Sequence, residues 1–284
     1  MAKVFVVGLG RMGRGIVKNL VRRGHSVSGY DVNKEAYRAL EGVIGFTPSD
    51  SLSAALGYDY VLLLLPTARE LLPTLEALSS AQGVVINMTT IGLEDAKAAA
   101  MRAPPKYITA MIEGGPANAE AGTMTLYVGG PKDVYEQSAA LLRDLGTPIY
   151  IGSHEAATAM KLFSTAILLA NVAVLAEVSQ ALLALGVDPD LIVKALSSGG
   201  ADSAQLRSRL PLMLSRSYKD LFSAELGAYV IREAVNAARS LGSPYLPLLT
   251  AVGELLEASK SVGLGLHDVS EVAELYRALS MRKG

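Results

Sequence analysis

The N-terminal segment at residues 8–13 has the glycine spacing of a phosphate-binding turn. It fits the pattern G-x-G-x-x-G and consists of Gly8, Leu9, Gly10, Arg11, Met12 and Gly13. The first glycine of such a turn allows a tight bend, the second lets backbone N–H groups approach a pyrophosphate, and the third lets the next helix pack against the strand. The N-terminus of that helix also attracts the anion. The segment therefore predicts the binding of a dinucleotide.

The residues around this turn strengthen the prediction, because the glycine pattern alone is common. The run KVFVV precedes the turn as a strand, and the run SVSGYD forms a second strand that ends at Asp31, 18 positions after Gly13. A carboxylate there would accept hydrogen bonds from the adenosine ribose hydroxyls and would repel a 2′-phosphate. We therefore expect NAD as the cofactor. Arg11 and Lys34 are cations near these positions, so NADP remains an alternative.

The composition excludes several kinds of chemistry. The 284 residues include no cysteine and three histidines far apart in sequence, so we expect no disulfide, no thiolate nucleophile and no metal site. The formal net charge is -1, from 26 Lys and Arg against 27 Asp and Glu, which gives no reason to expect nucleic acid or an anionic membrane as a partner. The predicted partner is a small molecule.

The first half of the chain alternates short β-rich runs with helical patterns, which is typical of parallel βαβ units. The expected strands are KVFVVG, SVSGYD, YVLLLLP, GVVINM, KYITAMI, TLYVGG and PIYIG. Several of these runs are apolar throughout, as expected for strands that helices cover on both faces. We therefore predict an α/β, Rossmann-type, doubly wound sheet that forms a dinucleotide-binding domain over residues 1–155.

The β pattern stops after Gly152, and the second half of the chain reads as helices. One long Ala/Leu/Val helix is expected over residues 156–186. Further helices are expected at 188–198, 203–215, 222–241, 247–261 and 268–280. We therefore predict an all-helical domain over residues 156–284, with roles in substrate binding and oligomerisation.

The long helix is apolar around most of its circumference, which favours a position between domains or in a subunit interface. We therefore expect a homodimer or a homotetramer. The apolar stretch at 162–176 has about 15 residues, fewer than the ~20 that span a bilayer, so we expect a buried helix and no membrane. The N-terminus lacks the regions of a signal peptide, which favours a cytoplasmic location.

Five motifs, taken in order, resemble those of the 3-hydroxyisobutyrate dehydrogenase family of β-hydroxyacid dehydrogenases. They are GLGRMGRGIVKNLVRRGHSV at 8–27, LLLP at 63–66, NMTTI at 87–91, EGGPANAEAGTMTLYVGG at 113–130 and MKLFSTAILLAN at 160–171. The resemblance implies a Rossmann-type domain followed by a helical domain. It also implies hydride transfer between C4 of nicotinamide and the hydroxyl-bearing carbon of a small 3-hydroxy acid, or the reverse reaction on its semialdehyde.

Lys161 matches the catalytic lysine of this family. The resemblance implies that it takes the hydroxyl proton during alcohol oxidation and protonates the developing alkoxide during reduction. Burial in its apolar surroundings would lower the pKa of Lys161 and bring proton exchange closer to neutral pH. The alternative is a lysine at the start of a helix that extends its ammonium group into solvent.

Four further residues match family positions in loops. Gly114 and Gly115 fall on the substrate loop, where small residues expose backbone N–H groups to a carboxylate. Pro66 falls on the loop beneath the cofactor, and Thr90 falls where the family approaches the nicotinamide. The alternatives are a plain glycine turn and ordinary residues at strand ends.

The chain departs from the family at positions that contact substrate. Glu113 stands where the family usually has serine, and Ser164 and Thr165 replace the usual asparagines after the lysine. An alignment without gaps places Tyr229 at the family's second Lys-Asp-Leu motif, whereas the run that begins at Lys219 lies too early and is expected in a surface loop. A carboxylate at Glu113 would repel a substrate carboxylate. One hypothesis is therefore a small 3-hydroxy amino acid whose ammonium pairs with Glu113.

Three other functions remain as alternatives. The first is a reductase of glyoxylate-like or succinic semialdehyde-like compounds. The second is an imine reductase, in which an acidic residue or a tyrosine commonly replaces the lysine; Lys161 argues against it, and Tyr229 keeps it open. The third is a cofactor-binding scaffold without turnover.

Overall fold

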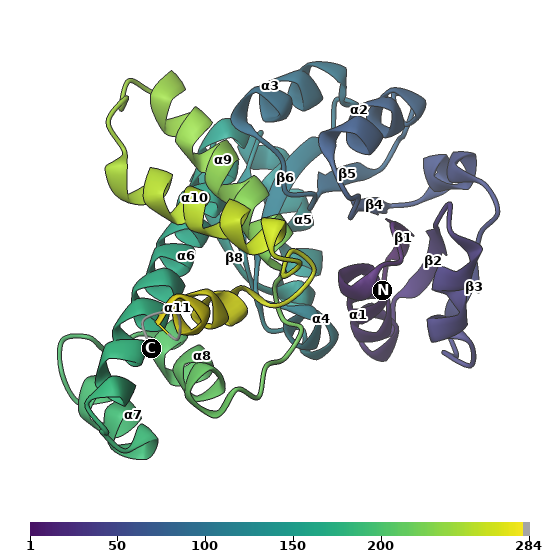
Figure 1. Ribbon diagram of the computed structural model, residues 1–284. Coiled ribbons are helices and arrows are strands. Elements are labelled where there is room, and N and C mark those ends of the chain that lie inside the picture. The colour runs from purple at the N-terminus through teal and green to yellow at the C-terminus, as the bar shows by residue number, and fades with distance from the viewer. Residues whose placement is uncertain (281–284) are drawn as a thin grey trace. The chain divides into compact units, whose positions relative to one another are not determined.

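The computed structural model describes residues 1–280, which divide into two units, the first Met1–Lys161 and the second beginning at Leu162. The first unit is built on an eight-stranded sheet with the strand order β3-β2-β1-β4-β5-β6-β7-β8 (Figure 1). The strands are β1 (Lys3–Val7), β2 (Ser26–Tyr30), β3 (Phe46–Pro48), β4 (Tyr60–Leu63), β5 (Val84–Asn87), β6 (Tyr107–Glu113), β7 (Met124–Gly129) and β8 (Gly146–Gly152). The predicted doubly wound sheet is confirmed.

Helices cover both faces of this sheet. They are α1 (Arg11–Arg22), α2 (Ala68–Ala77), α3 (Leu93–Arg102), α4 (Pro116–Ala121) and α5 (Lys132–Leu145), with 3-10 helices η1 (Lys34–Leu40) and η2 (Leu52–Gly57). Alternate residues of β1 enter two separate cores: Val4 and Val6 pack with α1 and α5, and Phe5 and Val7 pack with α2 and α3. The apolar strands of the sequence are thus buried on both faces.

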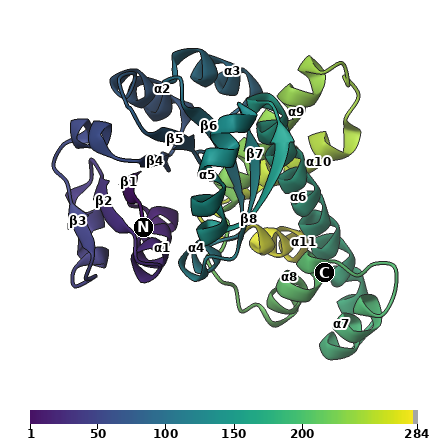
Figure 2. The same ribbon diagram turned by 180° about the vertical axis from the view of Figure 1, so that it is seen from behind.

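The sheet differs from the expected parallel arrangement at one pair of strands. β6 and β7 are antiparallel, whereas β7 and β8 are parallel again, with α5 packed against both (Figure 2). Residues 114–123 connect β6 to β7 and are fewer than the roughly dozen residues that a parallel crossover needs. The sequence reading also missed β3, because its three residues are too short for a recognisable alternation.

Within residues 162–280 the second unit consists of helices joined by loops, with one isolated β-bridge between Ser223 and Asp268. The helix α6 (His154–Ala184) begins in the first unit and continues into this one. The others are α7 (Pro189–Ser197), α8 (Ala204–Ser215), α9 (Ala224–Ser240), α10 (Pro247–Ser261), η3 (Val269–Glu271) and α11 (Val272–Ser280). The predicted helical second half is confirmed.

A buried carboxylate, Asp268, joins several of these helices. Its oxygens accept hydrogen bonds from the N–H groups of Leu221 (3.1 Å), Phe222 (2.8 Å) and Ser270 (3.0 Å). The Arg209 guanidinium lies 3.5 Å away and is also buried. Because a buried charge is costly unless it is paired and hydrogen-bonded, this network stabilises the start of α9 and the segment before α11.

The helix α6 is longer than the expected apolar stretch and only partly buried. By length and composition it could cross a membrane, with a mean hydropathy of 1.9 over its most apolar window, of which 33% is buried. Met160, Ile167, Val174 and Val178 are exposed on it. A single helix of this kind is weak evidence for a membrane, because core helices of soluble proteins share these properties.

Candidate active site

The loops that carry the predicted cofactor residues lie at one edge of the sheet. β1, β2, β4 and β5 are parallel neighbours, so their carboxyl ends meet at the same edge. Gly8 follows β1, Asp31 follows β2, Pro66 follows β4 and Thr90 follows β5. The direction of strand succession reverses between β1 and β4, and ligands of open α/β sheets bind outside the carboxyl ends at such a point.

The three glycines of the turn differ in the space that a side chain would have at each position. Gly8 has φ +94°, and a Cβ there would lie 2.1 Å from the carbonyl oxygen of Leu64. A Cβ on Gly13 would lie 2.0 Å from the carbonyl oxygen of Gly8, so the helix packs too closely for a side chain. A Cβ on Gly10 would meet no atom within 4 Å. Gly10 is therefore free of internal packing and lies at the start of α1, where a pyrophosphate would approach.

Asp31 is tied to this turn by its own carboxylate. Its Oδ2 accepts a hydrogen bond of 2.7 Å from the N–H of Leu9, and its Oδ1 accepts one of 2.8 Å from the N–H of Asn33. The carboxylate is thus held against the glycine turn. Lys34 forms a 2.8 Å ion pair with Asp50, so its charge already has a carboxylate partner.

A buried hydroxyl that the sequence reading missed shapes the loops after β4 and β5. Thr89 Oγ1 accepts a hydrogen bond from the N–H of Leu65 (3.0 Å) and lies 3.3 Å from the carbonyl oxygen of Leu63. These bonds join the loop of Pro66, which is exposed, to the loop of Thr90, which is half-buried. A threonine directly after a buried strand is the only sequence signal for this role, and it does not distinguish Thr89 from Thr90.

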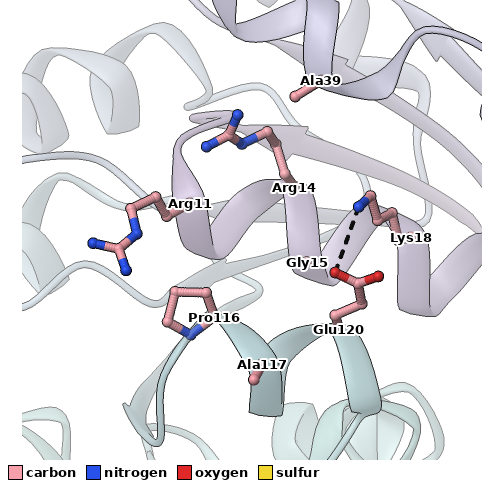
Figure 3. A pocket seen from close by; sticks show the side chains of 8 residues that line it. All are labelled: Arg11, Arg14, Gly15, Lys18, Ala39, Pro116, Ala117 and Glu120. Carbon is pink, nitrogen blue, oxygen red and sulfur yellow. Dashed lines mark hydrogen bonds and ion pairs between the residues drawn. The ribbon is translucent and has the colours of Figure 1, made fainter. Parts of the chain in front are cut away.

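A pocket of about 280 Å³ lies beside the turn, between α1 and α4 (Figure 3). It is lined by Arg11, Arg14, Gly15, Lys18, Ala39, Pro116, Ala117 and Glu120. The charged residues of the lining are three cations, Arg11, Arg14 and Lys18, and one carboxylate, Glu120. The Nζ of Lys18 lies 3.5 Å from this carboxylate. α4 approaches α1 closely at Gly15, where a Cβ would lie 3.0 Å from that of Ala119. The segment after Glu113 therefore packs against the helix that starts at the glycine turn.

Lys161 and Glu113 meet in the first unit. Glu113 is the last residue of β6, which is parallel to β5, so it lies at the same edge as the cofactor loops. Its Oε1 is 3.4 Å from the Nζ of Lys161, and the side chains are 22% and 15% exposed. Burial lowers the pKa of Lys161, and the Glu113 carboxylate partly opposes that shift. Lys161 thus does not extend its ammonium group into open solvent.

The two glycines after Glu113 differ in their surroundings. Gly114 has φ +120°, a conformation that favours glycine. The N–H of Gly115 donates a 3.0 Å hydrogen bond to Oδ1 of Asn118. One of the two backbone donors predicted for a substrate carboxylate therefore already has a partner in the chain.

The remaining predicted substrate residues belong to the second unit. Ser164 and Thr165 follow Lys161 by three and four residues on α6, which places all three on the same face of that helix. Thr165 is buried, and its hydroxyl has no hydrogen-bond partner among residues 1–280. Tyr229 is half-buried on α9, and the Arg232 guanidinium lies 5.4 Å from its ring centre. Lys219 is exposed in the loop before α9, as expected.

The sheet order, the glycine turn and the acidic residue after β2 define the class: this chain is an NAD(P)-dependent oxidoreductase. The family model for the NAD binding domain of 6-phosphogluconate dehydrogenase matches residues 3–153. The model for the NAD-binding domain of NADP-dependent 3-hydroxyisobutyrate dehydrogenase matches residues 156–276. The chain therefore belongs to the 3-hydroxyisobutyrate dehydrogenase family of β-hydroxyacid dehydrogenases.

Relatives match along nearly the whole chain. The 2-(hydroxymethyl)glutarate dehydrogenase of Eubacterium barkeri is 25% identical and covers 98% of this chain and 96% of its own. The 3-sulfolactaldehyde reductase of Escherichia coli (strain K12) is 29% identical with the same coverage. The structure of a 3-hydroxyisobutyrate dehydrogenase of Mycobacterium tuberculosis with L-serine has a TM-score of 0.87 at 22% identity, over 98% of this chain and 99% of that one. This structural match shows the common fold.

Proposed function

We propose that this chain transfers hydride reversibly between NAD and the hydroxyl-bearing carbon of a small 3-hydroxy acid, with Lys161 as the general acid and base. The observation that carries the proposal is the buried Lys161 ammonium beside Glu113, at the sheet edge that also presents the glycine turn. A lysine with a pKa lowered by burial is suited to exchange a proton near neutral pH.

The residues of the turn fit a dinucleotide. The open space at Gly10 and the N-terminus of α1 suit a pyrophosphate, and Asp31 suits the adenosine ribose hydroxyls. When bound, the dinucleotide supplies the acceptor or donor of the hydride. Neutral Lys161 takes the hydroxyl proton during oxidation, and protonated Lys161 delivers it to the developing alkoxide during reduction. Pro66 and Thr90, at the ends of their strands, would flank the nicotinamide.

The cofactor preference depends on the charge of Asp31. We expect Asp31→Asn to raise the ratio of NADP to NAD affinity about tenfold, because the amide retains an acceptor for the N–H of Leu9 and removes the charge that repels a 2′-phosphate. Calorimetric titration with each cofactor measures the ratio. Glu35→Gln is the matched control, since Glu35 is an exposed carboxylate nearby that pairs with Arg38. An unchanged ratio in Asp31→Asn would refute this basis for selectivity.

The substrate contacts are proposed to come from Gly114, Gly115, Ser164, Thr165 and Tyr229 together with Glu113. The hypothesis of an amino-bearing substrate stays a prediction. The Oε1 of Glu113 already faces Lys161, so a substrate ammonium would have to share the carboxylate with it.

A panel of substrates tests the proposed reaction. We expect turnover in both directions with NAD, for 3-hydroxy acids and for their semialdehydes, in steady-state assays of nicotinamide absorbance. Reduction of aldehydes without alcohol oxidation would favour the semialdehyde or glyoxylate-type reductase, and turnover of imines alone would favour the imine reductase. Binding of NAD without turnover of any member would favour the non-catalytic scaffold.

The apolar residues exposed on α6 support a further proposal, that the chain assembles as a homodimer or homotetramer through this helix. Covering α6 by a second copy would remove its exposed apolar side chains from water. We also propose a cytoplasmic location for this chain.

A further inference from the structure

The carboxylate of Glu113 has an unusually restricted environment. Its Oε1 is buried and makes no hydrogen bond among residues 1–280, and its recorded polar contact is the Lys161 ammonium at 3.4 Å. Glu113 ends a strand whose other residues are buried, so its backbone is fixed by the sheet. A half-buried carboxylate at this distance from a buried ammonium acts electrostatically on that ammonium.

The other titratable groups near the start of α6 do not replace this contact. His154, two turns before Lys161, has its Nδ1 3.0 Å from the hydroxyl of Thr109 and stacks on Tyr107 at 4.9 Å. Burial lowers the pKa of His154, with Glu155 opposing it, and burial raises the pKa of Tyr107 to about 12, so both rings are neutral near pH 7. Among the described residues, Glu113 is the charged group that acts on Lys161.

We propose that Glu113 is a positioning residue for the proton transfer: it holds the Lys161 ammonium at the sheet edge and makes the pair electrically neutral. The inference rests on the proposed function of Lys161. In this arrangement Lys161 is held as a donor between turnovers, and its proton passes to the substrate oxygen while the carboxylate stays in place.

The sign of the effect follows from the opposing influences on Lys161. Burial lowers the pKa of Lys161, whereas the carboxylate raises it. Removing the carboxylate therefore lowers the pKa of Lys161 further. Reduction needs protonated Lys161, so the decline of its rate with rising pH would begin at a lower pH than in wild type. Oxidation needs neutral Lys161, so the increase of its rate with rising pH would also begin at a lower pH.

The test compares pH profiles of kcat for wild type, Glu113→Gln, Glu113→Asp and Glu136→Gln. We expect Glu113→Gln to move the limb governed by Lys161 down by about one pH unit or more, as for loss of an opposite charge at this distance. Glu113→Asp keeps a carboxylate, so its pH profile should lie between those of Glu113→Gln and wild type. Glu136→Gln is the matched control, because Glu136 is an exposed carboxylate on α5 that pairs with Lys132 and lies outside the candidate site. A Glu113→Gln profile that superimposes on wild type would overturn the proposal.

A second readout does not depend on activity. The Cε of Lys161, which is bonded to the ammonium nitrogen, is labelled with ¹³C and assigned by comparison with Lys161→Ala. Its chemical shift is followed against pH in NMR spectra of the whole protein. A downward shift of its midpoint in Glu113→Gln supports the pairing even if no substrate of the panel reacts. The same midpoint in both proteins overturns it. If Glu113→Gln fails to fold, Glu113→Ser, which carries the residue usual in the family, serves in both experiments.

Discussion

Replacing Lys161 by alanine is expected to lower kcat about 10²- to 10⁴-fold, which is the usual contribution of a positioned general acid or base. The loss should appear in both directions of the reaction, because the same group takes the proton in oxidation and returns it in reduction. The affinity for NAD should stay within about twofold of wild type. The turn that binds the dinucleotide is built from residues 8–13 and Asp31 and contains no contact with Lys161 among those the structure records.

Two control variants distinguish the loss of proton transfer from the loss of the positive charge at position 161 and from a nonspecific effect of removing a lysine. Lys161→Arg keeps a cation but removes a group that can exchange its proton near neutrality, so it should be nearly as inactive as Lys161→Ala. Lys132→Ala removes an exposed lysine of α5 and should keep the wild-type rate. Turnover of Lys161→Ala at the wild-type rate would refute the assignment of Lys161.

The second large effect is expected at the glycine turn. Gly13→Ala would place a Cβ 2.0 Å from the backbone oxygen of Gly8, so the turn or α1 must move. We expect at least a 100-fold loss of NAD affinity, about 2.7 kcal/mol, together with a lower melting temperature. Gly10→Ala meets no atom within 4 Å, so its stability should stay within about 1 kcal/mol of wild type. Its NAD affinity should still fall at least tenfold, because the new methyl group occupies the approach of the pyrophosphate.

Calorimetric titration with NAD and thermal unfolding of each variant measure the two effects separately. Gly57→Ala is the matched control, because Gly57 lies in η2 and a Cβ there also meets no atom within 4 Å. It should change neither property. Wild-type NAD affinity in Gly10→Ala would show that the pyrophosphate does not approach the backbone at this turn.

Local patterns were sufficient to predict most of the fold. The apolar runs, the glycine turn and the acidic residue at the end of SVSGYD act over short stretches, and the observed strands follow them. The long helix begins at His154 and ends at Ala184, two residues before the predicted bounds at both ends. The antiparallel β6–β7 pair was missed because strand direction depends on the length of the connection and on packing, which no local pattern records.

The candidate site was predictable in its residues and not in their contacts. Lys161 and Glu113 were identified separately, but the sequence reading assigned Glu113 to the substrate and did not pair it with the lysine. They lie 48 positions apart (161 minus 113), and only the sheet and α6 together bring their side chains to 3.4 Å. Gly115 was expected to offer its N–H to a substrate, and its bond to Asn118 depends on how α4 begins.

The most direct test of the central claim follows the hydride itself. The protein is incubated with reduced NAD that carries deuterium at both hydrogen positions of C4 of the nicotinamide and with the panel of semialdehydes, and the products are analysed by mass spectrometry. With wild type we predict one deuterium on the new hydroxyl-bearing carbon. With Lys161→Ala we predict that the same product forms about 10²- to 10⁴-fold more slowly. Tight binding of the cofactor without transfer of deuterium to any aldehyde of the panel would contradict the proposed dehydrogenase.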